Sequence, residues 1–106
     1  MSMTAADVLA AAGRIAGRVK RTPVVAARTG DVTLYLKCEN LQDSGSFKLR
    51  GATNWMATLD KAALERGVMA FSSGNHAAGV ALAARRAGTK ARVVMPHDAP
   101  AVKVAN

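Results

Sequence analysis

Apolar residues recur at helical spacing near the start of the chain. Thr4 is suited to cap a helix, and Asp7 follows in the first turn, where the positive end of the helix dipole favours a carboxylate. The pattern predicts one helix that ends before Thr22 and Pro23, because proline cannot continue a helix and restrains the residue before it. The expected apolar face consists of Val8, Leu9, Ala12, Ile15, Ala16 and Val19.

The middle of the chain predicts a strand, a polar loop and a second helix. Gly30 and Asp31 are typical of a turn, and residues 32–37 (VTLYLK) have the character of a strand. Residues 39–46 are polar and predict a loop, and a helix is expected over residues 46–59. The apolar side of that helix is formed by Leu49, Ala52, Met56 and Leu59.

The second half of the chain predicts a strand, a helix and a further strand. Residues 68–72 and 91–95 are short apolar runs, and the alanine-rich residues 76–87 form a helix between them that Gly88 closes. Such a unit normally places its two strands in parallel, with a right-handed connection. Residues 101–106 resemble the opening of another helix. Because one helix cannot cover both faces of a parallel pair, we expect the chain to be the front part of a larger α/β protein.

The composition indicates a globular protein. Half of the 106 residues are hydrophobic and 4% are aromatic, and no apolar run approaches the roughly 20 residues that a membrane helix needs. The N-terminus lacks a basic segment ahead of its apolar stretch, so no secretory signal is expected. Cys38 is the single cysteine, which excludes an internal disulfide and favours a reducing, cytoplasmic location.

The formal charge of +8 raises the question of a nucleic-acid partner. The basic residues, however, are scattered along the chain, and the aromatic residues on which single-strand binders stack bases are nearly absent. A solvated basic surface is the preferred interpretation, and neither a nucleic-acid nor a membrane partner is expected. The sequence contains no metal-ligand spacing, P-loop or GxGxxG pattern, so no metal site is expected either.

Two short motifs contain residue types that carry chemistry. In the first, Lys48 follows Gly45, Ser46 and Phe47 at the start of the second predicted helix. A neutral lysine amine is a nucleophile that forms a Schiff base with a carbonyl group. Taken alone, the same position suits an ordinary solvent-facing helix lysine.

The second motif, residues 72–76 (SSGNH), joins a predicted strand to a predicted helix. Open α/β sheets bind ligands at the carboxyl ends of parallel strands, and the N–H groups at a helix start favour an anion such as a carboxylate. Ser72, Ser73 and Asn75 add side-chain donors. The same residues are also common in a plain N-cap cluster, and a single histidine such as His76 is usually structural.

Together these motifs resemble those of fold-type II pyridoxal-phosphate enzymes, in the branch of threonine dehydratase and serine racemase. The resemblance rests on residues 37–54 (KCENLQDSGSFKLRGATN), 72–77 (SSGNHA) and 93–96 (VVMP), and it extends over nearly the whole chain. It implies part of an α/β fold with three αβα layers and parallel strands, similar to the tryptophan synthase β subunit. Residues 1–50 would belong to the larger cofactor domain, including the lysine loop, and residues 51–106 would begin the smaller α/β domain.

The resemblance also implies a role for each matching residue. Lys48 would bind pyridoxal 5′-phosphate covalently and later move the α-proton of the substrate. Phe47 would pack beside the cofactor ring, and Asn75 would hydrogen-bond the phenolic oxygen of the cofactor. The substrate carboxylate would be held by the second motif, which consists of Ser72, Ser73, Gly74, Asn75 and His76.

The implied activity is the deaminating dehydration of L-threonine or L-serine to a 2-oxo acid and ammonia. The parent enzyme would be a homo-oligomer of amino-acid metabolism, for example of isoleucine biosynthesis. The alternatives are a serine or hydroxyaspartate racemase or ammonia-lyase of the same family, and an inactive truncated chain. Ser73 favours racemisation, because family members that racemise tend to have a second acid/base serine there.

Two features limit what the resemblance implies. Ala78 departs from the glutamine that is usual in the family two residues after the histidine, which leaves the substrate preference open. In relatives, the glycine-rich loop that holds the cofactor phosphate lies further along the chain than residue 106. We therefore expect the 106 residues alone to bind the cofactor poorly and to be inactive.

Overall fold

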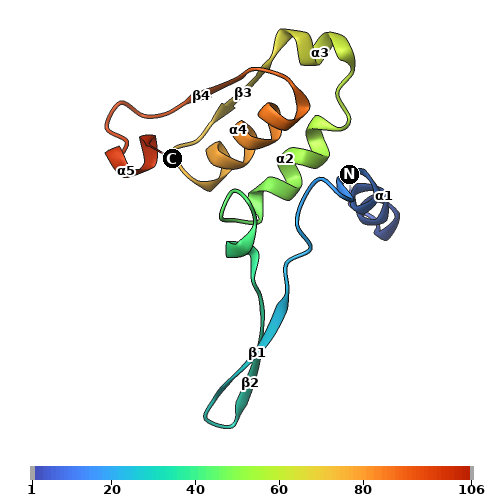
Figure 1. The fold of residues 1–106 in the computed structure, drawn as a ribbon, viewed down its shortest axis with the longest axis vertical. Coiled ribbons are helices and arrows are strands. Elements are labelled where there is room, and N and C mark those ends of the chain that lie inside the picture. The colour runs from blue at the N-terminus through green and yellow to red at the C-terminus, as the bar shows by residue number, and fades with distance from the viewer. Residues whose placement is uncertain (1, 106) are drawn as a thin grey trace.

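The computed structural model describes residues 2–105. A hairpin of two strands extends from a body in which helices pack beside a parallel pair of strands (Figure 1). In chain order the elements are α1 (Ala5–Ile15), β1 (Val24–Thr29), β2 (Val32–Lys37), a 3-10 turn (Glu39–Leu41), α2 (Lys48–Met56), α3 (Lys61–Arg66), β3 (Val68–Phe71), α4 (Asn75–Ala87), β4 (Ala91–Val94) and α5 (Ala101–Val104).

The parallel strands and the helix between them confirm the prediction for the second half of the chain. β3 and β4 pair in parallel, from Val68 opposite Ala91 to Phe71 opposite Val94, and α4 connects them. α4 ends at Gly88, whose φ of 70° lies in the left-handed region that glycine adopts without a steric penalty. Because β3 leads almost directly into α4, residues 72–74 lie at the carboxyl end of this strand.

The core lies between α2, α4 and β3. Its most deeply buried side chain is that of Leu49, with 0% exposed. The whole cluster consists of Leu49, Ala52, Met56, Val68, Val80, Ala83 and Ala84. The predicted apolar side of the second helix is thereby confirmed, and Leu59 packs at the margin of the cluster. The alanines of α4 allow the two helices to approach closely, which fixes the first turn of α2 against the core.

The predicted strand over residues 32–37 is confirmed as β2, and it pairs with a strand that was not predicted, β1. The two strands are antiparallel, with Val25 opposite Leu36 and Thr29 opposite Val32. Gly30, with a φ of 59°, and Asp31 form a two-residue turn between them, as is typical of hairpins. β1 is hard to predict because its sequence, VVAART, does not alternate apolar and polar residues.

The first helix begins as predicted and ends earlier. The Thr4 hydroxyl oxygen accepts a hydrogen bond from the Asp7 N–H at 3.2 Å, and the Asp7 carboxylate accepts one from the Thr4 N–H at 2.8 Å. α1 ends at Ile15, and Gly17 then adopts a positive φ of 71°. The predicted continuous apolar face as far as Val19 is therefore wrong, and no residue of α1 is buried.

Two further helix boundaries differ from the prediction. α2 begins at Lys48 and ends at Met56, so it is shorter at both ends than the expected residues 46–59. α3 was not predicted; Asp60 caps it by accepting a hydrogen bond from the Ala63 N–H at 2.7 Å. At six residues it is too short for helical periodicity to identify.

The expected domain boundary at residue 50 lies within α2, and the division into residues 1–50 and 51–106 stays a prediction. No helix within residues 2–105 has the length and apolar character of a membrane span. Over the same range, the side chains of His, Cys, Asp and Glu form no group of three or more that is placed to hold a metal ion.

Candidate active site

Lys48 is the first residue of α2, and its side chain is exposed. The turn before it is closed by the Gly45 N–H, which donates to the Gln42 carbonyl at 2.8 Å, and Gly45 has a φ of 72° that favours glycine. Ser46 is buried, whereas Phe47 is exposed, with its ring centroid 5.0 Å from the Lys48 Nζ. The fold thus presents a primary amine beside an aromatic ring at a helix start.

Gly79 brings α4 onto the backbone of Lys48. A Cβ at position 79 would lie 3.1 Å from the Lys48 carbonyl carbon, and 3.2 Å from the Lys48 Cβ and the Leu49 nitrogen. These distances are shorter than ordinary van der Waals contacts, so glycine permits an approach that any larger residue would disturb. The start of α2 is therefore held against the side of α4, one turn after Asn75.

The turn between β3 and α4 leaves the start of α4 open. The Ser72 N–H continues the strand pairing by donating to the Val94 carbonyl at 3.0 Å. The Ser72 hydroxyl accepts a hydrogen bond from the Gly74 N–H at 3.2 Å. Gly74 is the N-cap residue and has no side chain with which to cap the helix. The first N–H groups of α4 are therefore available to an anionic ligand.

The two helices that carry the candidate residues differ from their neighbours in their caps. α1 and α3 are capped by the side chains of Thr4 and Asp60. α2 and α4 have no side-chain cap. An uncapped helix start is a favourable site for a phosphate or carboxylate group, because its N–H groups and the helix dipole both attract negative charge.

A cleft of about 680 Å³ lies between the lysine loop, which we define as residues 39–50, and the turn after β3. Ser44 and Gly45 border it on one side, and Ser73, Gly74 and Asn75 border it on the other. The rest of its wall is formed by Asp43, Ala77, Ala78, Ala81, Leu82, Arg85, Val93 and Met95. The structure thus brings part of the second motif opposite the turn that leads to Lys48.

Other predicted residues lie outside the wall of this cleft. His76 lines a separate hollow of about 260 Å³ together with Trp55 and Met69. Phe47, Lys48 and Ser72 do not border the cleft within the part of the chain that the structure describes. The roles proposed for all of these side chains stay predictions.

Glu39 is held as a carboxylate at the entrance of the lysine loop. Arg50 donates from Nε to Glu39 Oε2 at 2.9 Å and from Nη2 to Oε1 at 2.6 Å, and the Thr22 hydroxyl donates to Oε1 at 2.5 Å. The hydrogen bonds from Arg50 are the main reason that the pKa of Glu39 is lowered to about 2, although burial opposes the shift. The sequence predicted only a polar loop here; the opposite charges eleven residues apart were the available signal.

Glu39 is expected to make the protein less stable as the pH falls from about 4.5 to about 2. A carboxyl group whose pKa is lower in the folded than in the unfolded protein stabilises the fold above its unfolded pKa, and this stabilisation is lost as the pH falls through the folded value. Denaturant midpoints measured across this range should fall less steeply in Glu39→Gln than in the parent protein. The same slope in both proteins would contradict this assignment.

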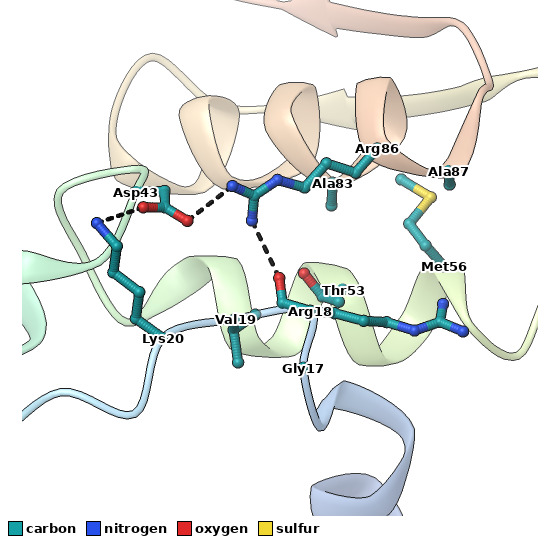
Figure 2. A pocket seen from close by; sticks show the side chains of 10 residues that line it. All are labelled: Gly17, Arg18, Val19, Lys20, Asp43, Thr53, Met56, Ala83, Arg86 and Ala87. Atoms are coloured by element: carbon teal, nitrogen blue, oxygen red, sulfur yellow. Dashed lines mark hydrogen bonds and ion pairs between the residues drawn. The ribbon is translucent and has the colours of Figure 1, made fainter.

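Asp43 links the lysine loop to the N-terminal segment and to the end of α4 (Figure 2). Its Oδ1 lies 2.5 Å from the Lys20 Nζ, and its Oδ2 accepts a hydrogen bond from Arg86 Nη2 at 2.7 Å. Arg86 also donates to the Arg18 carbonyl at 3.0 Å. The hydrogen bonds from Lys20 and then Arg86 lower the pKa of Asp43. Sequence reasoning missed this contact, because its partners lie far apart along the chain.

Together, these observations describe an α/β protein in which the uncapped start of α4 borders a cleft, and the turn that leads to Lys48 lies on the other side of that cleft. The sequence model of the family described as "Pyridoxal-phosphate dependent enzyme" matches residues 15–106. The chain belongs to this family, and pyridoxal phosphate is the cofactor of the family.

Relatives within the family have related activities. The chain is 54% identical over 103 residues to an L-threo-3-hydroxyaspartate ammonia-lyase from Pseudomonas sp, a match that covers 93% of this chain and 32% of the relative. It is 50% identical over 92 residues to the mitochondrial threonine dehydratase of Schizosaccharomyces pombe, covering 83% of this chain and 15% of that enzyme. The chain thus spans about a third or less of the length of the curated relatives it matches.

A solved structure confirms the fold. Maize serine racemase superposes with a TM-score of 0.87 at 46% identity, over 92% of this chain and 31% of the racemase chain. The chain is therefore a mixed α/β part of the fold-type II architecture, as the sequence predicted.

The residues present fit pyridoxal phosphate. The Lys48 amine suits the cofactor aldehyde, and Phe47 provides an apolar ring beside that amine. The Ser46 hydroxyl is buried just before Lys48 and has no hydrogen-bond partner within residues 2–105, so the lysine loop retains an unused polar group. The uncapped starts of α2 and α4 add N–H donors for anionic groups.

Proposed function

We propose that the chain is part of an enzyme that converts L-threonine or L-serine to a 2-oxo acid and ammonia. In this reaction the α-hydrogen and the β-hydroxyl leave as water, and hydrolysis of the resulting enamine consumes water and releases ammonia. The observation that carries the proposal is the position of Lys48, at an uncapped helix start that Gly79 holds against α4, together with the cleft between the turn that leads to Lys48 and the turn with Ser73 and Asn75.

Each candidate residue has a defined task in this proposal. The Lys48 Nζ would hold the cofactor aldehyde and would take the α-proton of the substrate. The open N–H groups at the start of α4, with the side chains of the second motif, hold the substrate carboxylate. Phe47 would pack against the cofactor ring, and Asn75 would donate to the phenolic oxygen of the cofactor. When bound, pyridoxal phosphate supplies an electron sink for the carbanion at the substrate Cα.

A racemase or ammonia-lyase acting on serine or hydroxyaspartate is the second candidate. Ser73 borders the cleft, where its hydroxyl is available as a second acid/base group. The small side chain of Ala78 lines the same cleft and leaves room for a substrate that differs from threonine. The names of the relatives, which include a hydroxyaspartate ammonia-lyase and serine racemases, support this second candidate.

Ser73→Ala is expected to separate the two activities. Loss of a general acid/base group lowers the rate of the step that it catalyses by about 10²- to 10⁴-fold. The rate of racemisation should therefore fall far more than the rate of ammonia release. Chiral chromatography of the amino acid and a coupled assay for ammonia measure the two rates on the same sample. An equal fall in both rates would show that Ser73 is not the second acid/base group.

The proposal is tested on the whole enzyme of which the chain is proposed to be part, by incubating it and pyridoxal phosphate with L-threonine, L-serine and L-threo-3-hydroxyaspartate. Formation of one equivalent of 2-oxo acid for each equivalent of ammonia supports the lyase. Formation of the opposite enantiomer supports the racemase. Absence of both products, in a protein that has taken up the cofactor, would contradict the proposal.

Several finer predictions belong to the same proposal. Because the chain spans about a third of the length of its relatives, we expect the 106 residues by themselves to turn over little substrate. A homo-oligomeric assembly, a cytoplasmic location and a part in isoleucine biosynthesis also stay predictions. Gel filtration of the protein would test the homo-oligomeric assembly, and fractionation of cells that express it would test the cytoplasmic location.

A further inference from the structure

The ends of the lysine loop, residues 39–50, are joined by one enclosed ion pair. Arg50 contacts both carboxylate oxygens of Glu39 through two of its nitrogens, a planar fork that fixes direction as well as distance. Only 17% of the Glu39 side chain and 30% of the Arg50 side chain are exposed. Solvent and salt therefore screen this pair less than a pair on the open surface.

The pair is braced from outside the loop by residues 20–22. The Gln42 side chain accepts a hydrogen bond from the Lys20 N–H at 3.2 Å and donates to the Lys20 carbonyl at 2.6 Å. Arg50 also donates to that carbonyl, at 3.1 Å. Thr22, whose hydroxyl binds Glu39, is 4% exposed, and so is Gln42. Hydrogen bonds thus hold the loop at its first residue, Glu39, at Gln42, and at its last residue, Arg50.

This fastening acts on the candidate lysine. Arg50 lies two residues after Lys48 in the first turn of α2, and Glu39 lies where the loop begins. A fixed distance between the two ends limits the paths that the turn over residues 42–47 can take. Within residues 2–105, neither Glu39 nor Arg50 is among the residues that border the cleft.

We propose that Glu39 and Arg50 are a positioning pair that sets the place of the Lys48 amine relative to the cleft. The inference rests on the proposed function of Lys48, and it assigns to the pair a task in addition to stability. Since displacing a reacting group by about 1 Å can cost about 10²-fold in rate, a partial release of the loop should lower the reactivity of Lys48 by about tenfold.

The test measures, in the whole enzyme of which the chain is proposed to be part, how fast pyridoxal phosphate labels Lys48 when borohydride fixes the cofactor to the protein. Mass spectrometry gives the labelling of Lys48 relative to exposed Lys90 in the same molecules, at a temperature where every variant is folded by circular dichroism. Glu39→Gln removes the negative charge. Arg50→Lys keeps the positive charge but cannot donate two parallel hydrogen bonds from one planar group to the Glu39 carboxylate. Glu65→Gln is the matched control, because it makes the same chemical change in an exposed pair, Lys61–Glu65, with side chains that are 92% and 67% exposed.

We expect the Lys48 to Lys90 ratio to fall about tenfold in Glu39→Gln and several-fold in Arg50→Lys, and to stay unchanged in the control. Without cofactor, amide hydrogen exchange over residues 42–49 should become faster in the first two variants alone. Faster exchange with an unchanged labelling ratio would overturn the inference, since the pair would then serve stability only. If the parent protein shows no preference for Lys48 over Lys90, the proposed function fails, and the inference fails with it.

Discussion

Lys48→Ala, made in the whole enzyme of which the chain is proposed to be part, is expected to lower ammonia release by at least about a thousandfold, because the variant lacks both the amine that binds the cofactor and the base that takes the α-proton. The variant should fold normally, since the Lys48 side chain is exposed and alanine is a good helix former. The loss would be measured as the rate of ammonia release and as the cofactor that borohydride fixes to the protein.

Lys61→Ala is the control for this prediction. Lys61 is also the first residue of a helix, and 92% of its side chain is exposed. Its replacement should leave both the rate and the fixed cofactor unchanged. A Lys48→Ala variant that keeps its rate within about tenfold would show that another amine performs the chemistry.

Leu49→Ala is expected to lower the free energy of unfolding by about 2–5 kcal/mol. Leu49 is 0% exposed and packs between α2, α4 and β3, so its truncation leaves a cavity in addition to the lost burial of apolar surface. Chemical denaturation, monitored by circular dichroism, measures the change in the free energy of unfolding.

Leu41→Ala provides the comparison, because the same substitution is made at a half-exposed leucine. Its effect should stay below about 1 kcal/mol. Equal effects at Leu41 and Leu49 would show that the core of the isolated chain is not packed as the structure describes.

The sequence predicted those parts of the fold that depend on local pattern. Helical spacing placed Leu49, Ala52 and Met56 on one side of a helix, and a continuous apolar run predicted β3. The boundaries of α1 and α2 were less accurate, because they depend on where a glycine such as Gly17 turns the chain and on how the loop before Lys48 is fastened. β1 escaped prediction, because its identity as a strand depends on pairing with β2.

The candidate site followed from the sequence only in part. The two motifs drew attention to Lys48 and to Ser73 through Asn75, and the fold places Ser73 through Asn75 at a cleft that the turn before Lys48 borders on the other side. The opposite charges of Glu39 and Arg50, eleven positions apart, were a signal for their contact, whereas no local pattern reveals the contact of Asp43 with Arg86, 43 positions apart. The close approach at Gly79 is equally a property of how two helices cross.

α2 carries the most deeply buried side chain of the core and the candidate amine at consecutive positions, Leu49 and Lys48. Neighbours on a helix point about 100° apart, so one faces inward while the other faces outward. The core thus fixes the backbone that carries the amine, and only the rotamers of the exposed lysine side chain remain to be restricted when it reacts. Substitutions that loosen this core should therefore reduce both the stability of the protein and the reactivity of the amine.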